Sequence, residues 1–185
     1  WAFANIRETG KPSKMMYAKV GEWEWTVLGE GNGWYPSLAG NHLSFLDGNA
    51  DGWICDLSKK PQKLEDCLKF NREGEQTEYM FFDKEDENRL VYFSKFDMKI
   101  VLAEKEGDTY KRTDLITEFS EESAGKAFSI LPRMFRGNVL LYIEVTTDGS
   151  RFGGRLCYYR LDKKKSYCMK TVSYTHLTLP TKRIV

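Results

Sequence analysis

Residues 41–46 read NHLSFL, and the same pattern returns as NRLVYF at 88–93 and as NVLLYI at 138–143. The three copies share asparagine at the first position, leucine at the third, an aromatic residue at the fifth and an apolar residue at the sixth. They begin at positions 41, 88 and 138, which are 47 and 50 residues apart. Residues 1–4, WAFA, fit the same frame with its first positions missing. The chain therefore repeats a unit of about 50 residues.

Short apolar runs surround each copy of the pattern. Polar turn residues separate them, so each unit is expected to hold four short strands. The run that follows each copy is Met15–Val20, Gly52–Leu57, Met98–Leu102 or Arg155–Tyr159. After a polar turn comes a further run, which is Trp23–Leu28, Lys63–Cys67, Tyr110–Leu115 or Ser166–Cys168. Another run precedes two of the copies, at Trp34–Leu38 and Tyr79–Phe82. Leu64, Cys67 and Leu68 fall at helical spacing, but their place in the repeat favours a strand.

Strands this short cannot bury both faces alone, and radial stacking of four-stranded sheets solves that problem while protecting the sheet edges. We therefore expect an all-β chain that forms a partial β-propeller of about four blades, each a four-stranded antiparallel sheet. The expected blades are 1–30, 31–70, 76–117 and 126–170. A β-sandwich also has short, regularly spaced strands, but three copies of one pattern favour the propeller.

Residues 171–185 are expected to be a non-native tail. TVSYTHLTLPT at 171–181 is similar to a translated transposase mosaic end, and the last four residues fit the index and adapter that follow it. We therefore expect a fragment of a longer protein, open before Trp1 and after Lys170. Removing the tail removes His176 and two basic residues, so 26 basic residues face 27 acidic ones and the net charge changes from +1 to −1.

The composition limits the classes of partner that the chain could bind. Aromatic residues make up 14% of the chain and interspersed charged residues 30%, which is typical of a globular protein. A near-neutral chain gives no electrostatic argument for binding nucleic acid. No apolar run approaches the roughly 18 residues of a membrane-spanning helix. We expect a partner that is a protein or a small ligand.

Residues 25–57, WTVLGEGNGWYPSLAGNHLSFLDGNADGWICDL, resemble the TolB-like propeller repeat of bacterial extracytoplasmic proteins. The segments that match its pattern are Trp25–Leu28, Tyr35–Leu38, Leu43–Phe45 and Trp53–Leu57. Gly40-Asn41 stands where that family has Asp-Gly. The resemblance implies a ring of about six to eight blades and a periplasmic or extracellular location. Plant F-box-associated propellers have a similar sequence pattern, and membership of that family would imply a cytoplasmic location.

The segment Asp47–Gly52 has the D-x-N-x-D-G form of a calcium loop, with Asp47, Asn49 and Asp51 as candidate ligands. Ser58 stands at loop position 12, where a bidentate carboxylate should complete the site. An ordinary Asp/Asn/Gly hairpin turn explains the same residues. Calcium is the one cofactor that the sequence suggests.

Cys55 and Cys67 occupy the third and fourth strands of one expected blade, and Cys157 and Cys168 occupy the same places two blades later. Folding each hairpin about its turn brings the two cysteines face to face. Opposed Cβ atoms lie about 4.5–5.5 Å apart, whereas a disulfide needs about 3.5–4.5 Å, so bonding requires local adjustment. Two disulfides would indicate an oxidising compartment. The alternative is that the cysteines fill small apolar gaps.

His42 is the one histidine outside the tail, and it takes a repeat position filled elsewhere by Arg89 and Val139. Such a position predicts a solvated strand face. The sequence contains no G-x-S-x-G, H-E-x-x-H, C-x-x-C or phosphate-loop motif, and we assign no catalytic residue.

Trp25, Trp34 and Trp53 are expected to pack within the strands, although tryptophans exposed on a propeller rim could bind peptide or sugar. The sequence thus predicts a non-catalytic extracytoplasmic propeller that binds its partner through rim loops. Two alternatives remain, the N-terminal gating propeller of a serine peptidase resembling prolyl oligopeptidase and a cytosolic F-box-associated propeller.

Overall fold

The computed structural model describes residues 1–22, 24–120, 127–147 and 152–169. The expected non-native tail at 171–185, with His176, lies outside the described residues.

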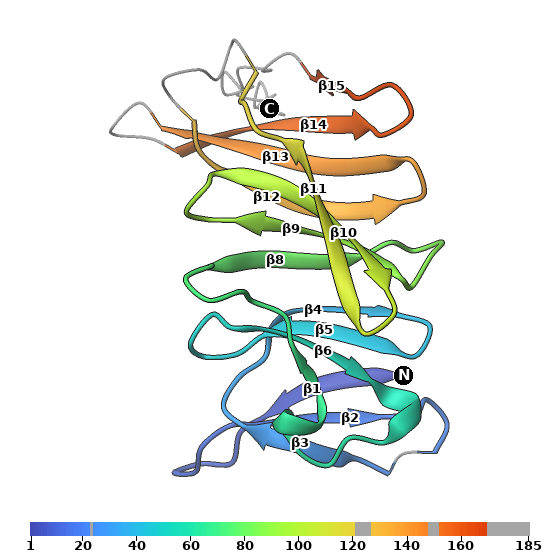
Figure 1. Ribbon diagram of the computed structural model, residues 1–185. Helices are drawn as coiled ribbons and strands as arrows, with labels where there is room; N and C mark the ends of the chain where they lie inside the picture. The colour runs from blue at the N-terminus through green and yellow to red at the C-terminus, as the bar shows by residue number, and fades with distance from the viewer. Residues whose placement is uncertain (23, 121–126, 148–151, 170–185) are drawn as a thin grey trace, which may run out of the picture.

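Four antiparallel sheets form in chain order and stack one on the next (Figure 1). The first sheet contains β1 (Ala2–Ile6), β2 (Lys14–Ala18) and β3 (Thr26–Glu30). The second contains β4 (Trp34–Ala39), β5 (His42–Leu46), β6 (Gly52–Asp56) and β7 (Leu68–Lys69). The third contains β8 (Thr77–Phe82), β9 (Arg89–Ser94), β10 (Lys99–Glu106) and β11 (Thr109–Ile116). The fourth contains β12 (Ala127–Arg136), β13 (Val139–Thr147), β14 (Phe152–Arg160) and β15 (Lys165–Cys168).

The first strands of successive four-stranded sheets converge. Strand β4 contacts β8, and β8 contacts β12. A parallel bridge between Asp83 and Phe135 joins the ends of the last two of these strands. This convergence is the arrangement of innermost strands about a propeller axis. The chain is thus an all-β partial β-propeller, as the repeat predicted.

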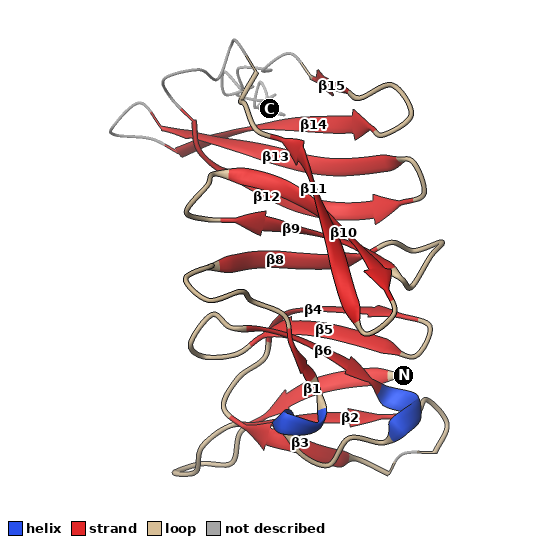
Figure 2. Ribbon diagram, viewed as in Figure 1, coloured by secondary structure: helices blue, strands red, loops and turns tan. Residues whose placement is uncertain are grey.

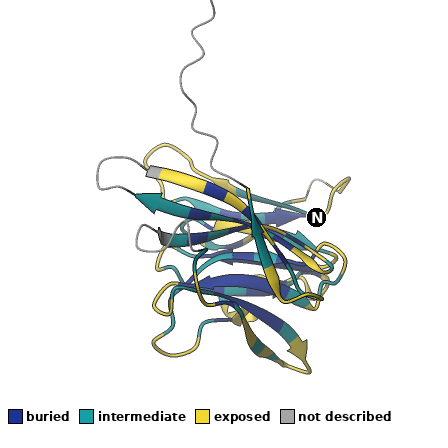
Figure 3. Cartoon of the chain, turned by 90° about the horizontal axis from the view of Figure 1, so that it is seen from above, coloured by how far each residue is buried: buried dark blue, intermediate teal, exposed yellow. Residues whose placement is uncertain are grey.

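The core lies between the sheets, and the repeat pattern builds it. In β9, Leu90 and Tyr92 pack toward the second sheet, whereas Val91 and Phe93 pack toward the fourth. Successive strand residues point to opposite faces, so each copy of the pattern contributes to two interfaces. Figure 3 shows the buried residues gathered along the strands and the exposed ones mainly in the turns. Burying one such side chain contributes about 1.5–3 kcal/mol.

The outer face of the fourth sheet carries apolar side chains that are partly exposed. Leu156 and Tyr158 of β14 are exposed on it. Ile100 and Leu102 occupy the corresponding positions of β10, and both are buried under the fourth sheet. A residue pattern that is buried in one sheet is therefore open to solvent in the next.

The fourth strand of the second sheet differs from the prediction. The run Lys63–Cys67 was expected to be a strand, but Leu64–Asp66 forms a short 3-10 helix and β7 has only two residues. The Asp66 carboxylate accepts hydrogen bonds from the backbone N–H groups of Gln62 and Lys63, which stabilise the turn instead of a ladder. A second 3-10 helix covers Leu57–Lys59 (Figure 2). Among the described residues, no helix has the length and apolar character needed to span a bilayer.

Candidate functional site

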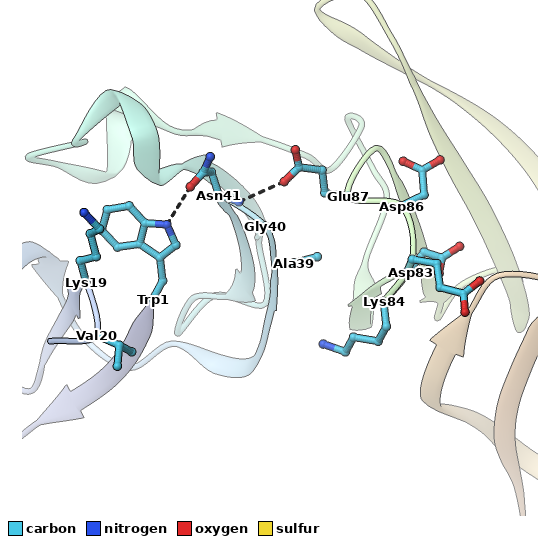
Figure 4. Close-up of a pocket in the computed structure, with 11 residues that line it drawn as sticks. Trp1, Lys19, Val20, Ala39, Gly40, Asn41, Asp83, Lys84, Asp86 and Glu87 are labelled. Atoms are coloured by element: carbon cyan, nitrogen blue, oxygen red, sulfur yellow. Dashed lines mark hydrogen bonds between the residues drawn. The ribbon is translucent and has the colours of Figure 1, made fainter.

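A hollow of about 760 Å³ lies beside the turns that join β4 to β5 and β8 to β9 (Figure 4). It is lined by Trp1, Lys19, Val20, Ala39–Asn41 and Asp83–Glu87. Asn41 bonds to lining residues on both sides of it. The indole Nε1 of Trp1 donates to the Asn41 side-chain oxygen at 2.9 Å, and the Asn41 backbone N–H donates to Glu87 at 3.0 Å. These bonds join the first three sheets.

The carboxylates of this hollow are occupied with holding the fold. Asp83 is fully buried and accepts hydrogen bonds from the Gly137 backbone N–H at 2.7 Å and from Arg89 at 3.2 Å. Glu85 accepts from Arg136 at 2.9 Å. Asp86 accepts from the backbone N–H of Asn88, which closes its own turn. The acidic hollow is therefore mainly a junction between sheets.

His42 does not lie on a solvated strand face, so that prediction is wrong. Its side chain is packed between the second and third sheets, and the residue is only 8% exposed. The imidazole Nδ1 lies 3.2 Å from a Glu87 carboxylate oxygen, and the ring lies 6.0 Å from that of Phe82. The hydrogen bond from the Asn41 backbone N–H to Glu87 holds the turn before His42 against the third sheet. The His42 side chain is therefore buried in the interface between the two sheets.

A second hollow, of about 370 Å³, lies at the opposite end of β4 and β8, where these strands begin. We call it the aromatic groove, and it is lined by Trp34, Tyr35, Leu46, Asp47, Gly48, Ala50, Glu78 and Tyr79. Trp34 is 53% exposed and Tyr35 is 42% exposed. The expectation that Trp34 packs within its strand is therefore wrong. Trp25 and Trp53 are half-buried.

A repeated backbone distortion builds the groove. The register of β4 shifts between Trp34 and Ser37, and that of β8 shifts between Glu78 and Phe81. Tyr35 and Tyr79 lie within these bulges, and each has a φ of 53°. A bulky residue in this left-handed region costs about 1–3 kcal/mol, and such strain gathers at functional sites.

The bulges place the two tyrosine rings against each other. Their ring centroids are 4.5 Å apart, with 51° between the ring planes, so the pair bridges the second and third sheets. Bulges characteristically re-aim a side chain in this way. Burial, together with a hydrogen bond to Tyr35, raises the pKa of Tyr79 to about 12. The Tyr79 phenol is therefore neutral at physiological pH. Sequence analysis missed this pair, although Tyr35 and Tyr79 precede their copies of the repeat pattern in similar apolar runs.

Asp47 is one of the two carboxylates that line the groove, beside Glu78. One carboxylate oxygen accepts from the backbone N–H groups of Asn49 at 2.8 Å and Asp51 at 3.1 Å, and the other accepts from the Trp53 indole at 2.9 Å. All three donors are neutral. Among the described residues, no ion pair joins Asp47 to a cation.

The three predicted calcium ligands lie in one turn, and the carboxylates of two of them, Asp47 and Asp51, are engaged within the protein. The carboxylate of Asp47 makes the three bonds just described, and Asp51 pairs with Lys69 at 2.6 Å. This is the geometry of a hairpin turn closed by an aspartate side chain. Calcium binding by Asp47, Asn49 and Asp51 stays a prediction, to be tested by titration with calcium.

The four cysteines are paired. Cys55 is bonded to Cys67 with Cα atoms 4.5 Å apart, and Cys157 to Cys168 with Cα atoms 4.0 Å apart. Cys157 and Cys168 are direct register partners in β14 and β15, whereas Cys67 lies just before β7. Glu144 lies near the second pair, but the three residues do not form a metal site of the thiolate kind, because the two sulfurs are bonded to each other.

Comparison with known proteins supports the fold. No family model matches the chain, and no curated protein matches it. A solved structure of oligogalacturonate lyase in complex with manganese is similar, with a TM-score of 0.51 and 16% sequence identity. The likeness covers 84% of this chain and 41% of the lyase chain, so the chain spans about two fifths of that protein. At this identity the likeness shows a shared propeller-type fold.

Proposed function

We propose that this chain is part of a non-catalytic β-propeller module, of the TolB-like kind, that binds a protein or small-ligand partner through the aromatic groove. The observation that carries the proposal is the exposure of Trp34 and Tyr35 at the rim of the sheets. Exposed aromatic side chains that line a hollow are favoured for recognition, because they offer large contact area at low cost in conformational entropy. The backbone strain at Tyr35 and Tyr79 supports the same assignment, since a purely structural role would favour relaxed residues.

An extracytoplasmic location is part of the proposal. The support is the pair of disulfides, which persist in oxidising compartments and are rare in the cytosol. The activity named for the structurally similar lyase is not extended to this chain, because a likeness at 16% identity concerns the fold. The gating and F-box-associated alternatives use the same fold, and no described contact favours either of them.

The test is a binding screen of the purified chain against immobilised peptides and oligosaccharides. We expect at least one ligand whose binding is lost in Trp34→Ala and in Tyr35→Ala. Tyr158→Ala is the matched control, because Tyr158 has nearly the same exposure (40%) but lies on the fourth sheet. Circular dichroism of each variant checks that it is folded. Equal binding by the groove variants and the control, or no binding at all, would overturn the proposal.

A further inference from the structure

We propose that the aromatic groove binds an organic cation, an alkylammonium or guanidinium group of the kind carried by lysine and arginine side chains. This inference rests on the proposed function and names the chemistry of its ligand. It is carried by the juxtaposition of exposed aromatic side chains with one carboxylate that lacks a cationic partner among the described residues.

The charge of the groove comes from two carboxylates with different surroundings. Glu78 is paired with Lys95 at 3.0 Å, so its charge is compensated within the protein. Asp47 receives only neutral donors, two backbone N–H groups and the Trp53 indole. These donors fix the carboxylate and leave its negative charge for a ligand.

The aromatic side chains supply the second half of a cation site. Trp34 and Tyr35 are exposed, and the Tyr79 ring lies against Tyr35. An organic cation is attracted to the face of Trp or Tyr when it lies within about 6 Å of the ring centre, and Trp is the most favourable ring. Because the Tyr79 phenol is neutral, its hydroxyl adds no charge of its own. A volume of about 370 Å³ suits a small cation or the end of a side chain.

The next groove along the molecule provides an internal comparison. It lies between the third and fourth sheets, has the same volume of about 370 Å³, and shares Glu78 and Tyr79 with the first. Lys95 lines it as well, so the acid in this groove stands beside its own cation. Aromatic character is thus common to both hollows, whereas the uncompensated carboxylate belongs to the groove at Asp47. The charge difference points to a cationic ligand for the first groove.

The experiment is calorimetric titration of the intact chain with Nα-acetyl-lysine methylamide, its Nε-acetylated analogue and tetramethylammonium chloride. We expect the lysine derivative to bind about tenfold more tightly than the neutral analogue. Binding by tetramethylammonium as well would identify a free cation as sufficient. Binding by the lysine derivative without it would identify a protein side chain as the source, because that cation also donates hydrogen bonds. Added salt is expected to weaken the interaction.

Asp47→Asn tests the carboxylate, with Asp51→Asn as the control in the same turn, because Asp51 is already paired with Lys69. We expect Asp47→Asn to weaken binding by about tenfold and Asp51→Asn to leave it unchanged. Should Asp47→Asn fail to fold, the inference is tested on the wild-type chain, by the salt dependence of binding and by the affinity for the neutral analogue. Equal affinity for the neutral analogue, with no salt dependence, would overturn the inference.

The proposed function and this inference fail in different ways. A ligand from the screen that requires Trp34 but binds independently of charge would remove only the cation assignment. If neither the screen nor the cations give binding that depends on Trp34, both are wrong.

Discussion

The backbone N–H of Gly137 in the fourth sheet donates a 2.7 Å hydrogen bond to the buried carboxylate of Asp83 in the third. The same carboxylate accepts from Arg89 at 3.2 Å and from the backbone N–H of Glu85 at 2.9 Å. One buried charge thus holds a turn, an arginine and a neighbouring sheet together.

Asp83→Ala is expected to lower the free energy of unfolding by about 3 kcal/mol, because the Gly137 N–H loses its acceptor and Arg89 keeps only its longer contact with Glu104, at 3.5 Å. Glu85→Ala is the control, since its ion pair with Arg136 is exposed and is worth under about 1 kcal/mol. Urea denaturation of both variants measures the difference. Equal midpoints would show that Asp83 does not couple the sheets.

Tyr35→Gly is expected to be more stable than Tyr35→Ala by about 1–2 kcal/mol, because glycine enters the left-handed region without the Cβ clash. At an ordinary strand position the order is reversed. Thermal denaturation of the two variants gives the comparison, and Tyr158→Gly with Tyr158→Ala supplies the ordinary position. If alanine is the more stable choice at position 35, the backbone there is not strained.

The disulfides predict zero reactive thiols in the denatured chain before reduction and four after it. The bonded pairs are 12 and 11 residues apart, and closing loops of this size stabilises a protein by about 2–3 kcal/mol. The double variants Cys55→Ala/Cys67→Ala and Cys157→Ala/Cys168→Ala should each lose about that much. Four thiols without reductant would remove the argument for an oxidising compartment.

The outer face of the fourth sheet is expected to cause self-association of the purified chain, because apolar surface of this kind is normally buried between sheets. Leu156→Lys and Tyr158→Lys should reduce the associated fraction without changing the circular dichroism spectrum. Val20→Lys is the control, since Val20 is exposed on a turn of the first sheet. Sedimentation velocity measures the effect, and an equal effect of the control would point to net charge alone.

Alkaline pH is expected to destabilise the fold through its buried tyrosines. Burial raises the pKa of Tyr142 to about 12, whereas an unfolded tyrosine has a pKa of about 10. Between pH 10 and about pH 12, Tyr142 therefore keeps its proton in the folded state and loses it in the unfolded state. This contribution to stability is complete below pH 10 and is lost as the pH rises toward 12. Tyr142→Phe should flatten the fall in denaturation midpoint over that range, and an unchanged profile would contradict the burial effect.

The pattern at 41–46, 88–93 and 138–143 predicted the strands because alternate residues of each copy must be buried on opposite faces. Local interactions explain where the prediction was wrong. Asp66 bonds to its own turn and prevents a strand, and this competition is not visible in hydrophobic periodicity. His42 is buried by a contact with Glu87, which lies 45 positions away in the chain.

The candidate groove was only partly visible in the sequence. The possibility that exposed tryptophans bind a partner was recognised, but Trp34 was expected to pack within its strand. Its exposure depends on a bulge in β4, and periodicity does not reveal such a shift. The pairing of Tyr35 with Tyr79 depends on the stacking of two sheets, which brings similar places in two repeats together.

The most direct test of the account is the ratio of the dissociation constants of Trp34→Ala and the wild-type chain for the tightest ligand in the binding screen. An aromatic residue at the centre of a binding site contributes at least about 2 kcal/mol, which corresponds to a ratio of about 30. We predict a ratio of at least that size, with Tyr158→Ala close to one. A ratio near one for Trp34→Ala, in a variant shown to be folded, would contradict the assignment of the aromatic groove as the binding site.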